Sequence, residues 1–596
     1  MIMKRGSRTL IAALTISLGL ATLVTSASQS ATNIIDPNQG WAIPDNTTQL
    51  GSQNGLFTER SSEDRDYSAL LDTTKIRNNQ LDPTCQSLDD PNCASAGNFV
   101  YYAQIPVCSS SSDINCIESV KATDATGKEF PGSFSRNFPD KAQNQYTGKP
   151  SLNLPSGGAG SLFTIPGAEG PAGNTYYVSF IMVGRASTDS SANLQSVHAS
   201  ITPVQLQEDQ RFKNMKWCKS PGEVCNTGYN KLETTPGNYI WNESGAGGTN
   251  CAEVSFVEGL CAEKEAFPPG FKFSIQVRLS LSPAGWLHGR MTNPEINISK
   301  VGAITTMLVS AEPVGVPLVY KHYMWSDLPA DLLALYDPTS GKYKGVGGGE
   351  GFSNSIIIGS DPSQRAWTTA PSPYSPISIA ELNAWLAHVG NTATVVPSYW
   401  SFRSLTQQEL QSANKCFVDP SKLTGIVTTD ATAYSPGPPA FDKSAGNLNY
   451  QVAAPHFVPN GTDTFKGTYD LLMQSSVARC IYGFSNAPIK ASVSVISSTG
   501  TPQVATTVVS EKNGWLHLSA NGFEFSSPTV TVNLQQDQVV VPAPVETTAP
   551  APIQTTAPAP IQQKVVAKQA LTCVKGKIVK KFNATKCPAG YKKKVG

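Results

Sequence analysis

Short apolar runs separated by turn-forming residues dominate the chain from Cys85 onward. In the clearest run, 271–281, every odd-numbered residue is apolar and every even-numbered residue is polar. Alternation with a period of two predicts a strand with one buried and one solvated face. Further strands are predicted over 99–105, 176–183, 489–495, 504–509 and 529–534. The chain is therefore expected to be mainly β.

Helices are expected only as short insertions in the second half of the chain. Ser326 is placed to cap a helix over 327–335. Two further helices begin with the spacing of a capping box, in Ser378 with Glu381 and in Thr406 with Glu409. Gly390 is expected to end the first of these two, because glycine adopts the left-handed conformation that follows many helices.

One tetrapeptide occurs in each half, as Gly285-Trp-Leu-His288 and as Gly514-Trp-Leu-His517. Each copy follows a predicted strand and precedes another, which suggests a duplicated β-domain. We interpret Trp286 and Trp515 as core residues, because large aromatic side chains contribute most to buried apolar area. The two histidines of the repeat are interpreted as structural hydrogen-bonding residues, since the histidines of this chain are dispersed and none is at metal-ligand spacing.

The N-terminal segment has the pattern of a secretory signal peptide. The basic residues Lys4, Arg5 and Arg8 precede an uncharged, mostly apolar run over 9–24. Small residues follow and suit cleavage after Ala27. An uncleaved N-terminal anchor is the alternative. No later stretch approaches the roughly 20 apolar residues of a spanning helix, so we expect no membrane span after removal of the signal.

The 12 cysteines all follow the signal and favour an oxidising compartment. An even number of cysteines in an exported protein predicts disulfides, whereas the sequence lacks the Cys-x-x-Cys spacing of zinc sites. Sequence alone leaves many connectivities open. Pairing of neighbours gives Cys85–Cys93, Cys108–Cys116, Cys218–Cys225, Cys251–Cys261 and Cys573–Cys587, with Cys416–Cys480 as a long-range pair.

Changes in composition divide the chain into segments. The two largest are predicted to be sandwich-like β domains stapled by disulfides, the second with short helical inserts. An octapeptide repeated within a Pro-rich stretch predicts an extended polyproline stalk. The predicted boundaries are 1–27 for the signal peptide, 28–84 for a polar N-terminal segment, 85–310 and 311–540 for the β-rich domains, 541–562 for the linker and 563–596 for a small basic β module.

Charge separates this module from the rest of the chain. Segment 563–596 holds ten lysines and no acidic residue, although the net charge of the whole chain is only +1, so the body is acidic. We expect the lysines to bind an anionic envelope polymer through weak contacts that salt screens; a solvated basic tail is the alternative, and nucleic acid is not expected. The envelope-binding candidates are Lys575, Lys577, Lys580, Lys581, Lys586, Lys592, Lys593 and Lys594.

A resemblance supports the export prediction. The tail Thr572-Cys-Val-Lys-Gly-Lys577, followed by Lys586-Cys-Pro-Ala-Gly-Tyr-Lys-Lys-Lys594, resembles a tail found at the ends of many secreted proteins of actinobacteria. Arg479-Cys-Ile-Tyr-Gly-Phe484, Asn513-Gly-Trp-Leu-His517 and Phe525-Ser-Ser-Pro528 are similar to a core that such proteins share. The resemblance implies an envelope or extracellular setting and brings no known activity or catalytic residue.

Catalytic motifs give little support for an enzyme. The sequence contains no G-x-S-x-G, H-E-x-x-H or phosphate-binding loop, and we expect no metal and no cofactor. The weak catalytic candidate is Asp327, which follows several aromatic residues and could protonate a sugar with Glu381 or Asp470 as the second carboxylate. The alternative places Asp327 in the first turn of a helix, where negative charge is favourable.

We therefore expect a noncatalytic secreted protein of the cell surface or cell wall. Its partner is expected to be cell-wall or another anionic envelope polymer, with glycans as a further class. A secreted carbohydrate-active hydrolase that uses Asp327 and a second carboxylate is the alternative, and a self-assembling layer subunit is a third hypothesis.

Overall fold

The computed structural model describes residues 51–59, 68–77, 84–93, 97–140, 145–171, 173–208, 251–255, 257–336, 366–369, 371–411, 413–485, 489–496, 502–503, 506–525, 529–536, 570–575, 578–583 and 591–593. They belong to two compact units, one within 1–537 and one within 538–596. The predicted signal peptide, the predicted stalk and the predicted Cys218–Cys225 pair lie outside the described residues.

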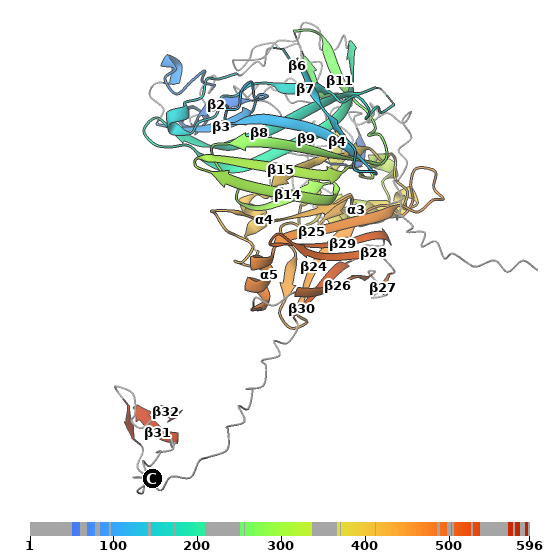
Figure 1. Ribbon diagram of the computed structural model, residues 1–596. Helices are drawn as coiled ribbons and strands as arrows, with labels where there is room; N and C mark the ends of the chain where they lie inside the picture. Colours follow the sequence, from blue (N-terminus) through green and yellow to red (C-terminus); the bar gives the residue numbers. More distant parts are fainter. Residues whose placement is uncertain are drawn as a thin grey trace, which may run out of the picture. The chain divides into compact units, whose positions relative to one another are not determined.

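The first unit is built on one large mixed sheet, whose strands run across the middle of Figure 1. Its path is β2 (Ala69–Asp72), β3 (Asn98–Gln104), β8 (Thr175–Ser187), β9 (Asn193–Glu208), β20 (Ser401–Ser404), β13 (Gly285–Arg290), β21 (Leu423–Thr429), β25 (Lys466–Gln474), β29 (Trp515–Glu524) and β28 (Thr506–Lys512). The branches are β6 (Ser133–Phe138), β7 (Gly160–Thr164), β10 (Cys251–Ser255) and β11 (Leu260–Lys264). Because β13 lies between β20 and β21, this sheet crosses the predicted boundary after residue 310.

Two smaller sheets cover the large one. The first contains β14 (Thr292–Val301), β15 (Ile304–Glu312), β12 (Phe271–Leu279), β4 (Cys116–Asp124) and β5 (Glu129–Pro131). The second contains β22 (Ala433–Tyr434), β23 (Ala440–Asp442), β24 (Asn447–Ala453), β30 (Thr529–Gln536), β26 (Ile489–Ile496) and β27 (Pro502–Gln503). Figure 1 shows the two groups of strands at different levels of the unit.

The two small sheets lie on opposite faces of the shared strands. Leu287 and Ile426 belong to the first core, which they form with the sheet that contains β12 and β15. Their sequence neighbours Trp286 and Val427 belong to the second core, which contains β24 and β30. Since consecutive side chains of a strand point to opposite faces, the strands between the cores are buried on both sides. Every residue of β21 is buried for this reason.

A third core is formed by helices and a small sheet. The sheet contains β17 (Val319–Met324), β1 (Ser52–Phe57) and β18 (Ala366–Thr369). The helices of this core are α2 (Ala330–Tyr336) and α3 (Ser378–Leu386). The remaining elements of the unit are β16 (Val314–Gly315), β19 (Ser398–Tyr399), α1 (Thr73–Arg77), α4 (Gln407–Leu410), α5 (Ser475–Tyr482) and the short 3-10 turns η2 (Pro91–Cys93), η3 (Pro150–Leu152), η5 (Trp325–Asp327) and η7 (Ala387–Val389).

The strand predictions and the mainly β, sandwich-like fold are confirmed. In β12 the odd-numbered residues from Phe273 to Leu279 are buried, as the alternation predicts, and Arg278 is buried with them. One predicted capping box is confirmed, because Thr406 Oγ1 accepts from Glu409 N (3.2 Å) while Glu409 Oε2 accepts from Thr406 N (2.9 Å).

The other two helix starts differ from the predictions. Ser378 does not act as a cap, since its hydroxyl donates to the carbonyl oxygens of Pro373 (2.7 Å) and Ser375 (2.8 Å). The helix predicted over 327–335 begins instead at Ala330, after a 3-10 turn. The predicted end at Gly390 is confirmed, with a φ of 62°.

The described disulfides follow neighbour pairing. Cys85–Cys93, Cys108–Cys116, Cys251–Cys261 and Cys416–Cys480 are all formed. Cys573 is also disulfide-bonded, while its predicted partner Cys587 lies outside the described residues. The Cys416–Cys480 bridge joins residues 64 apart in sequence, and a loop of that size corresponds to about 4 kcal/mol in the chain-entropy model.

The second unit contains a small antiparallel sheet, in which β31 (Ala570–Lys575) pairs with β32 (Ile578–Asn583) and β33 (Lys592–Lys593). Among the helices that the structure describes in either unit, none has the length and apolar character needed to span a membrane.

Candidate functional site

The three carboxylates that the sequence singles out belong to three separate hydrogen-bond networks. Asp327 lies in the 3-10 turn η5, where its Oδ1 accepts from the exposed Ser326 hydroxyl (3.2 Å). The predicted role at a helix N-terminus does not apply, because α2 begins three residues later. Two neighbouring aromatic residues, Tyr323 before the turn and Trp325 at its start, pack against the third core.

Glu381 is enclosed in that third core and is only 1% exposed. One carboxyl oxygen accepts from the Tyr336 hydroxyl (3.1 Å), which in turn accepts from Trp385 Nε1 (3.0 Å). The second oxygen has no hydrogen-bond partner among the described residues. Burial raises the pKa of Glu381 to about 7, because a charged carboxylate loses its hydration there.

Asp470, on β25, is fully buried and forms the most extensive of the three networks. Its Oδ2 accepts from Thr292 Oγ1 (2.9 Å), from the backbone N–H of Asn293 (3.1 Å) and, more weakly, from Thr428 Oγ1 (3.4 Å). Its Oδ1 is 2.9 Å from Nε2 of His517. These donors replace the water that the carboxylate loses on burial.

The backbone geometry after β13 aims these donors at Asp470. Asn293 has a φ of +50°, and the pairing of β14 with β15 is irregular between Thr292 and Glu295. Asparagine tolerates this left-handed conformation better than most residues. Its side chain donates to Glu312 Oε1 (3.1 Å), which holds the corner in place while the backbone N–H points to the carboxylate.

His517 lies on the same face of the sheet as a row of polar residues. The antiparallel pairing places Ser510 directly opposite His517 and Lys512 opposite Trp515. Farther along β29, Asn521 Nδ2 donates to the buried Ser519 hydroxyl (3.0 Å). The His517 side chain is 19% exposed, so one edge of the imidazole ring faces solvent while the other contacts a buried carboxylate.

Edge strand β14 lies next to this face and packs against β25. On this strand, Glu295 Oε1 accepts a hydrogen bond from Lys272 Nζ (2.7 Å). This contact, together with the charges of Lys512 and His517, holds the pKa of Glu295 below its usual range. Glu295 therefore lies near enough to Lys512 and His517 to interact with their charges. We call the surface formed by Ser510, Lys512, Trp515, His517 and Glu295 the β28–β29 shelf.

A second polar cluster lies on the opposite face of the large sheet, on β13 and β20, and its arginines are buried. Arg290 is 1% exposed and forms an ion pair with Glu59, with Nε donating to Oε2 (2.7 Å). Its Nη1 donates to the carbonyl oxygens of Thr429 (3.0 Å) and Ala431 (2.6 Å). The guanidinium lies over the ring of Tyr434, 4.8 Å from its centroid.

The second arginine of this cluster, Arg403, donates to both carboxyl oxygens of Glu409, each at 2.8 Å. His288 stacks on Tyr434 with ring centroids 3.9 Å apart. Burial, then the charges of Arg290 and Arg403, hold the pKa of His288 well below its ordinary value. Its Nε2 has no partner among the described residues, so the predicted structural hydrogen bond is replaced at this nitrogen by ring stacking.

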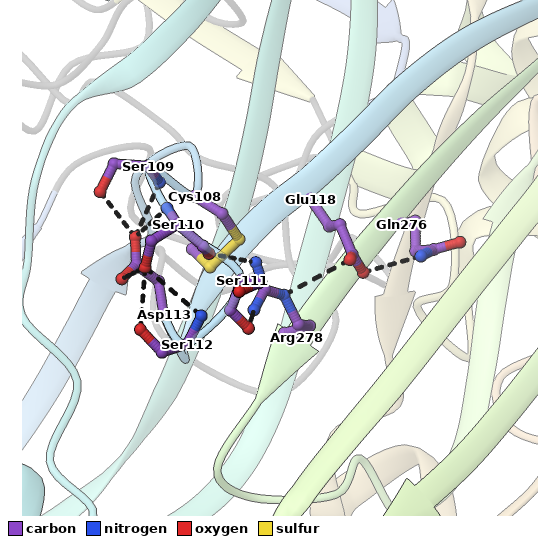
Figure 2. A network of polar contacts seen from close by, with 10 residues as sticks. Cys108, Ser109, Ser110, Ser111, Ser112, Asp113, Glu118, Gln276 and Arg278 are labelled. Atoms are coloured by element: carbon purple, nitrogen blue, oxygen red, sulfur yellow. Dashed lines mark hydrogen bonds and ion pairs between the residues drawn. A yellow bond between two sulfur atoms is a disulfide. The ribbon is translucent and has the colours of Figure 1, made fainter.

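A third polar cluster surrounds the exposed serine loop between Cys108 and Cys116 (Figure 2). Asp113 accepts from the backbone N–H groups of Ser109 (2.7 Å) and Ser110 (2.9 Å) and from both their hydroxyls, which lowers the pKa of its carboxyl. Arg278 of β12 donates to the carbonyl oxygens of Ser110 (2.7 Å) and Ser111.

Figure 2 shows the Arg278 guanidinium between this loop and Glu118, with Nε 3.6 Å from Glu118 Oε1. Gln276 also donates to Glu118 (2.7 Å). The carboxylates and the guanidinium of this cluster are thus engaged within the fold, as are the charged groups around Arg290 and Arg403. Compared with these two clusters, the shelf differs in having a solvent-facing imidazole edge.

The other aromatic candidates have structural positions. Trp400 is 1% exposed and its Nε1 donates to the carbonyl oxygen of Ala311 (3.0 Å). Trp286 is 1% exposed, as predicted for a core tryptophan, whereas Trp515 is only partly buried and packs against the first core.

The sequence predicts a structural role for His517 and has no motif that points to Ser510. A usable signal was present in the alternation of β29, where Leu516, Leu518 and Ala520 are apolar while the intervening residues Trp515, His517, Ser519 and Asn521 are aromatic or polar. A row of polar groups on one face of a buried strand requires partners or solvent. The partner, Asp470, is 47 residues away in sequence.

Within the described residues, the structure brings together no group of three or more His, Cys, Asp or Glu residues that could hold a metal ion. No protein-family model, no curated protein and no solved structure matches this chain.

Proposed function

We propose that the protein is exported and attaches to an anionic polymer of the cell envelope through its C-terminal module, while the acidic body serves as the binding or structural part. The single observation that carries this proposal is the pairing of lysine-bearing strands in a disulfide-bonded sheet. A pre-ordered array of lysines binds a polyanion without first ordering a flexible tail, which lowers the entropic cost of binding.

The strand register supports such an array. Cys573, which is buried and disulfide-bonded, pairs with Lys580 on one side and with Lys593 on the other. The next residue of β31, Val574, pairs with Lys592. Neighbouring strands of a sheet lie about 4.8 Å apart, so this pairing brings the backbones of Lys580, Lys592 and Lys593 close together.

Exposure of the described lysines agrees with this role. Lys575 and Lys592 are exposed, and Lys575 Nζ lies 5.9 Å from the ring centroid of Tyr591. Lys577, Lys586 and Lys594 lie outside the described residues. A phosphate-bearing or carboxylate-bearing polymer is the chemical class that such a cationic surface favours, with an affinity that falls as salt rises.

The experiment compares full-length mature protein with two variants on isolated cell walls at low and high salt. One variant replaces Lys575, Lys580, Lys581, Lys592 and Lys593 by Gln, and its matched control replaces the same residues by Arg. We expect the Gln variant to lose about 100-fold in wall affinity at low salt, about 0.5 kcal/mol for each lost charge contact. The Arg variant should bind like the wild type.

Walls stripped of anionic polymer provide the second arm, on which the wild type should bind no better than the Gln variant. Retention of wild-type affinity by the Gln variant on intact walls would refute attachment through the module. The carbohydrate hydrolase that uses Asp327 gains no support from the geometry, because Asp327 shares no network with Glu381 or Asp470.

A further inference from the structure

We propose that Ser510, His517 and Asp470 act together as nucleophile, general base and orienting carboxylate in the hydrolysis of short acyl esters on the β28–β29 shelf. This goes beyond attachment through the C-terminal module and rests on different residues. Three features carry the proposal: the buried carboxylate, the orientation of the imidazole, and the position of the serine.

The first feature is that Asp470 acts on His517 from a rigid position. Its side chain is fully buried, and its second oxygen is held by Thr292 and the backbone N–H of Asn293 at 2.9 and 3.1 Å. A carboxylate with so many fixed donors cannot rotate away from the imidazole. Positioning of a catalytic base by a buried, hydrogen-bonded carboxylate is the general arrangement of serine hydrolases on unrelated folds.

The second feature is the tautomer of His517 that this contact selects. When Nε2 donates its hydrogen to Asp470, the lone pair of the neutral ring lies on Nδ1. The 19% exposure of the side chain leaves the imidazole accessible at its solvent edge. The buried carboxylate also stabilises the imidazolium that forms when Nδ1 takes up a proton.

The third feature is the register that places Ser510 opposite His517. The turn between β28 and β29 consists of Asn513 and Gly514, both with positive φ (53° and 79°), and Lys512 pairs with Trp515 on either side of it. A two-residue turn of this kind determines the register of a hairpin. Directly opposed residues have Cβ atoms about 4.5 to 5.5 Å apart on one face, from which a serine hydroxyl can rotate to the ring nitrogen.

The reaction balances with these groups and water. Ser510 Oγ attacks the ester carbonyl carbon while its proton moves to Nδ1 of His517; the bond to the leaving alcohol then breaks and the alcohol takes that proton. Water attacks the acyl-serine in the second half and loses a proton to His517; the bond to Ser510 Oγ then breaks, this oxygen takes that proton, and the carboxylic acid is released. The overall change is ester plus water to acid plus alcohol.

The surroundings favour a short acyl group on a hydrophilic carrier. Ser510, Lys512 and Glu295 of β14 are all exposed. Charged neighbours and an open sheet face suit an acetyl ester of a polar polymer rather than a long fatty acyl chain, which would leave apolar surface in water. Charged groups near His517 include Asp470 from β25, Lys512 from β28 and Glu295 from β14.

The experiment treats the full-length mature protein with a fluorophosphonate probe and measures hydrolysis of 4-nitrophenyl acetate. The variants are Ser510→Ala, His517→Asn and Asp470→Asn. One control is His388→Asn, because His388 also contacts a carboxylate (Asp331, 2.8 Å) but that carboxylate is 61% exposed. A second control is Ser299→Ala, which removes another exposed strand serine.

We expect the probe to label Ser510, as located by peptide mass spectrometry, and labelling to disappear in Ser510→Ala. His517→Asn should slow labelling and turnover by about 100-fold, within the usual range for a general base, while both controls remain at the wild-type rate. Ser510 is exposed, so its replacement leaves the fold intact; near-ultraviolet circular dichroism checks the other variants. Absence of labelling at Ser510 in the wild type, or equal labelling rates in wild type and His517→Asn, would overturn the proposal.

Discussion

The two copies of Gly-Trp-Leu-His lie in the same sheet but in opposite environments. In the first copy Trp286 is 1% exposed in the second core, and His288 is buried against Tyr434. In the second copy Trp515 is only partly buried, against the first core, and the imidazole of His517 joins a buried carboxylate to solvent. The same tetrapeptide thus places its tryptophan in the second core in one copy and against the first core in the other.

The cause is a displacement of one residue between the copies. Following the pairs across the sheet, Trp286 aligns with Gly425, Gly425 with Met473, and Met473 with Leu516. The second tryptophan therefore comes one position earlier than alignment with the first would require, and a shift of one residue reverses the face of every side chain. Gly425 leaves the space that the Trp286 ring occupies, since a Cβ at this position would lie 2.5 Å from the ring.

The comparison predicts a large difference between the two tryptophans. Trp286→Ala should lower the free energy of unfolding by about 3 to 5 kcal/mol, because it opens a cavity in the second core. Trp515→Ala should cost only about 1 to 2 kcal/mol, because part of the ring is already in contact with water. Urea unfolding measures both. If the two variants lost the same free energy of unfolding, the difference in burial between the two tryptophans would have no effect on stability.

The first histidine of the repeat, His288, should make the folded protein less stable in acid. The folded state holds the pKa of His288 well below its usual value through burial and the charges of Arg290 and Arg403. Below about pH 6.5 the unfolded chain binds a proton that the folded chain does not. Stability therefore falls as pH decreases, by up to about 1.4 kcal/mol per pH unit, until the folded pKa is reached.

His288→Phe keeps a ring against Tyr434 and should remove this one-proton dependence between pH 6.5 and 4.5. The matched variant in the second copy, His517→Asn, leaves His288 in place and should retain it. Thermal unfolding across this pH range provides the measurement. If His288→Phe unfolds with the same pH dependence as the wild type, His288 is not the acid-sensitive group.

The smallest effect concerns the residue for which the two copies agree. Gly285 and Gly514 both have a φ of +79°, a conformation in which any side chain is strained. Gly285→Ala and Gly514→Ala should each cost about 1 kcal/mol. Gly97→Ala is the control, since its added Cβ meets nothing within 4 Å and its φ is not in this range. A clearly unequal cost for the two repeat glycines would contradict their equivalence.

Local signals in the sequence predicted much of the secondary structure. The alternation in 271–281 predicted β12, and Thr406 with Glu409 formed the expected capping box. The corresponding prediction for Ser378 was wrong because other partners compete for both side chains. The Ser378 hydroxyl donates to the carbonyl oxygen of Pro373, and Glu381 accepts from the Tyr336 hydroxyl. A capping box predicts a helix start only where no competing donor or acceptor reaches its side chains.

The candidate site was predicted only in part. Asp470 was named as a carboxylate of interest, but as the partner of Asp327 in sugar chemistry. Its contacts are instead with Thr292 of β14 and His517 of β29. Ser510 had no motif around it, because a nucleophile on a hairpin is placed by strand pairing rather than by a short local sequence. Motif searches detect geometry that neighbouring residues impose, and this geometry is imposed across three strands.

The sequence by itself determined the strands and the helix end at Gly390, and it favoured the pairing of near-neighbour cysteines, because each depends on residues a few positions apart. Only the tertiary structure decided that one sheet joins both halves, and that one face of β29 places His517 beside Asp470. The order of strands in a sheet follows from the packing of both its faces, and a period-two pattern specifies which residues share a face but not what will cover it.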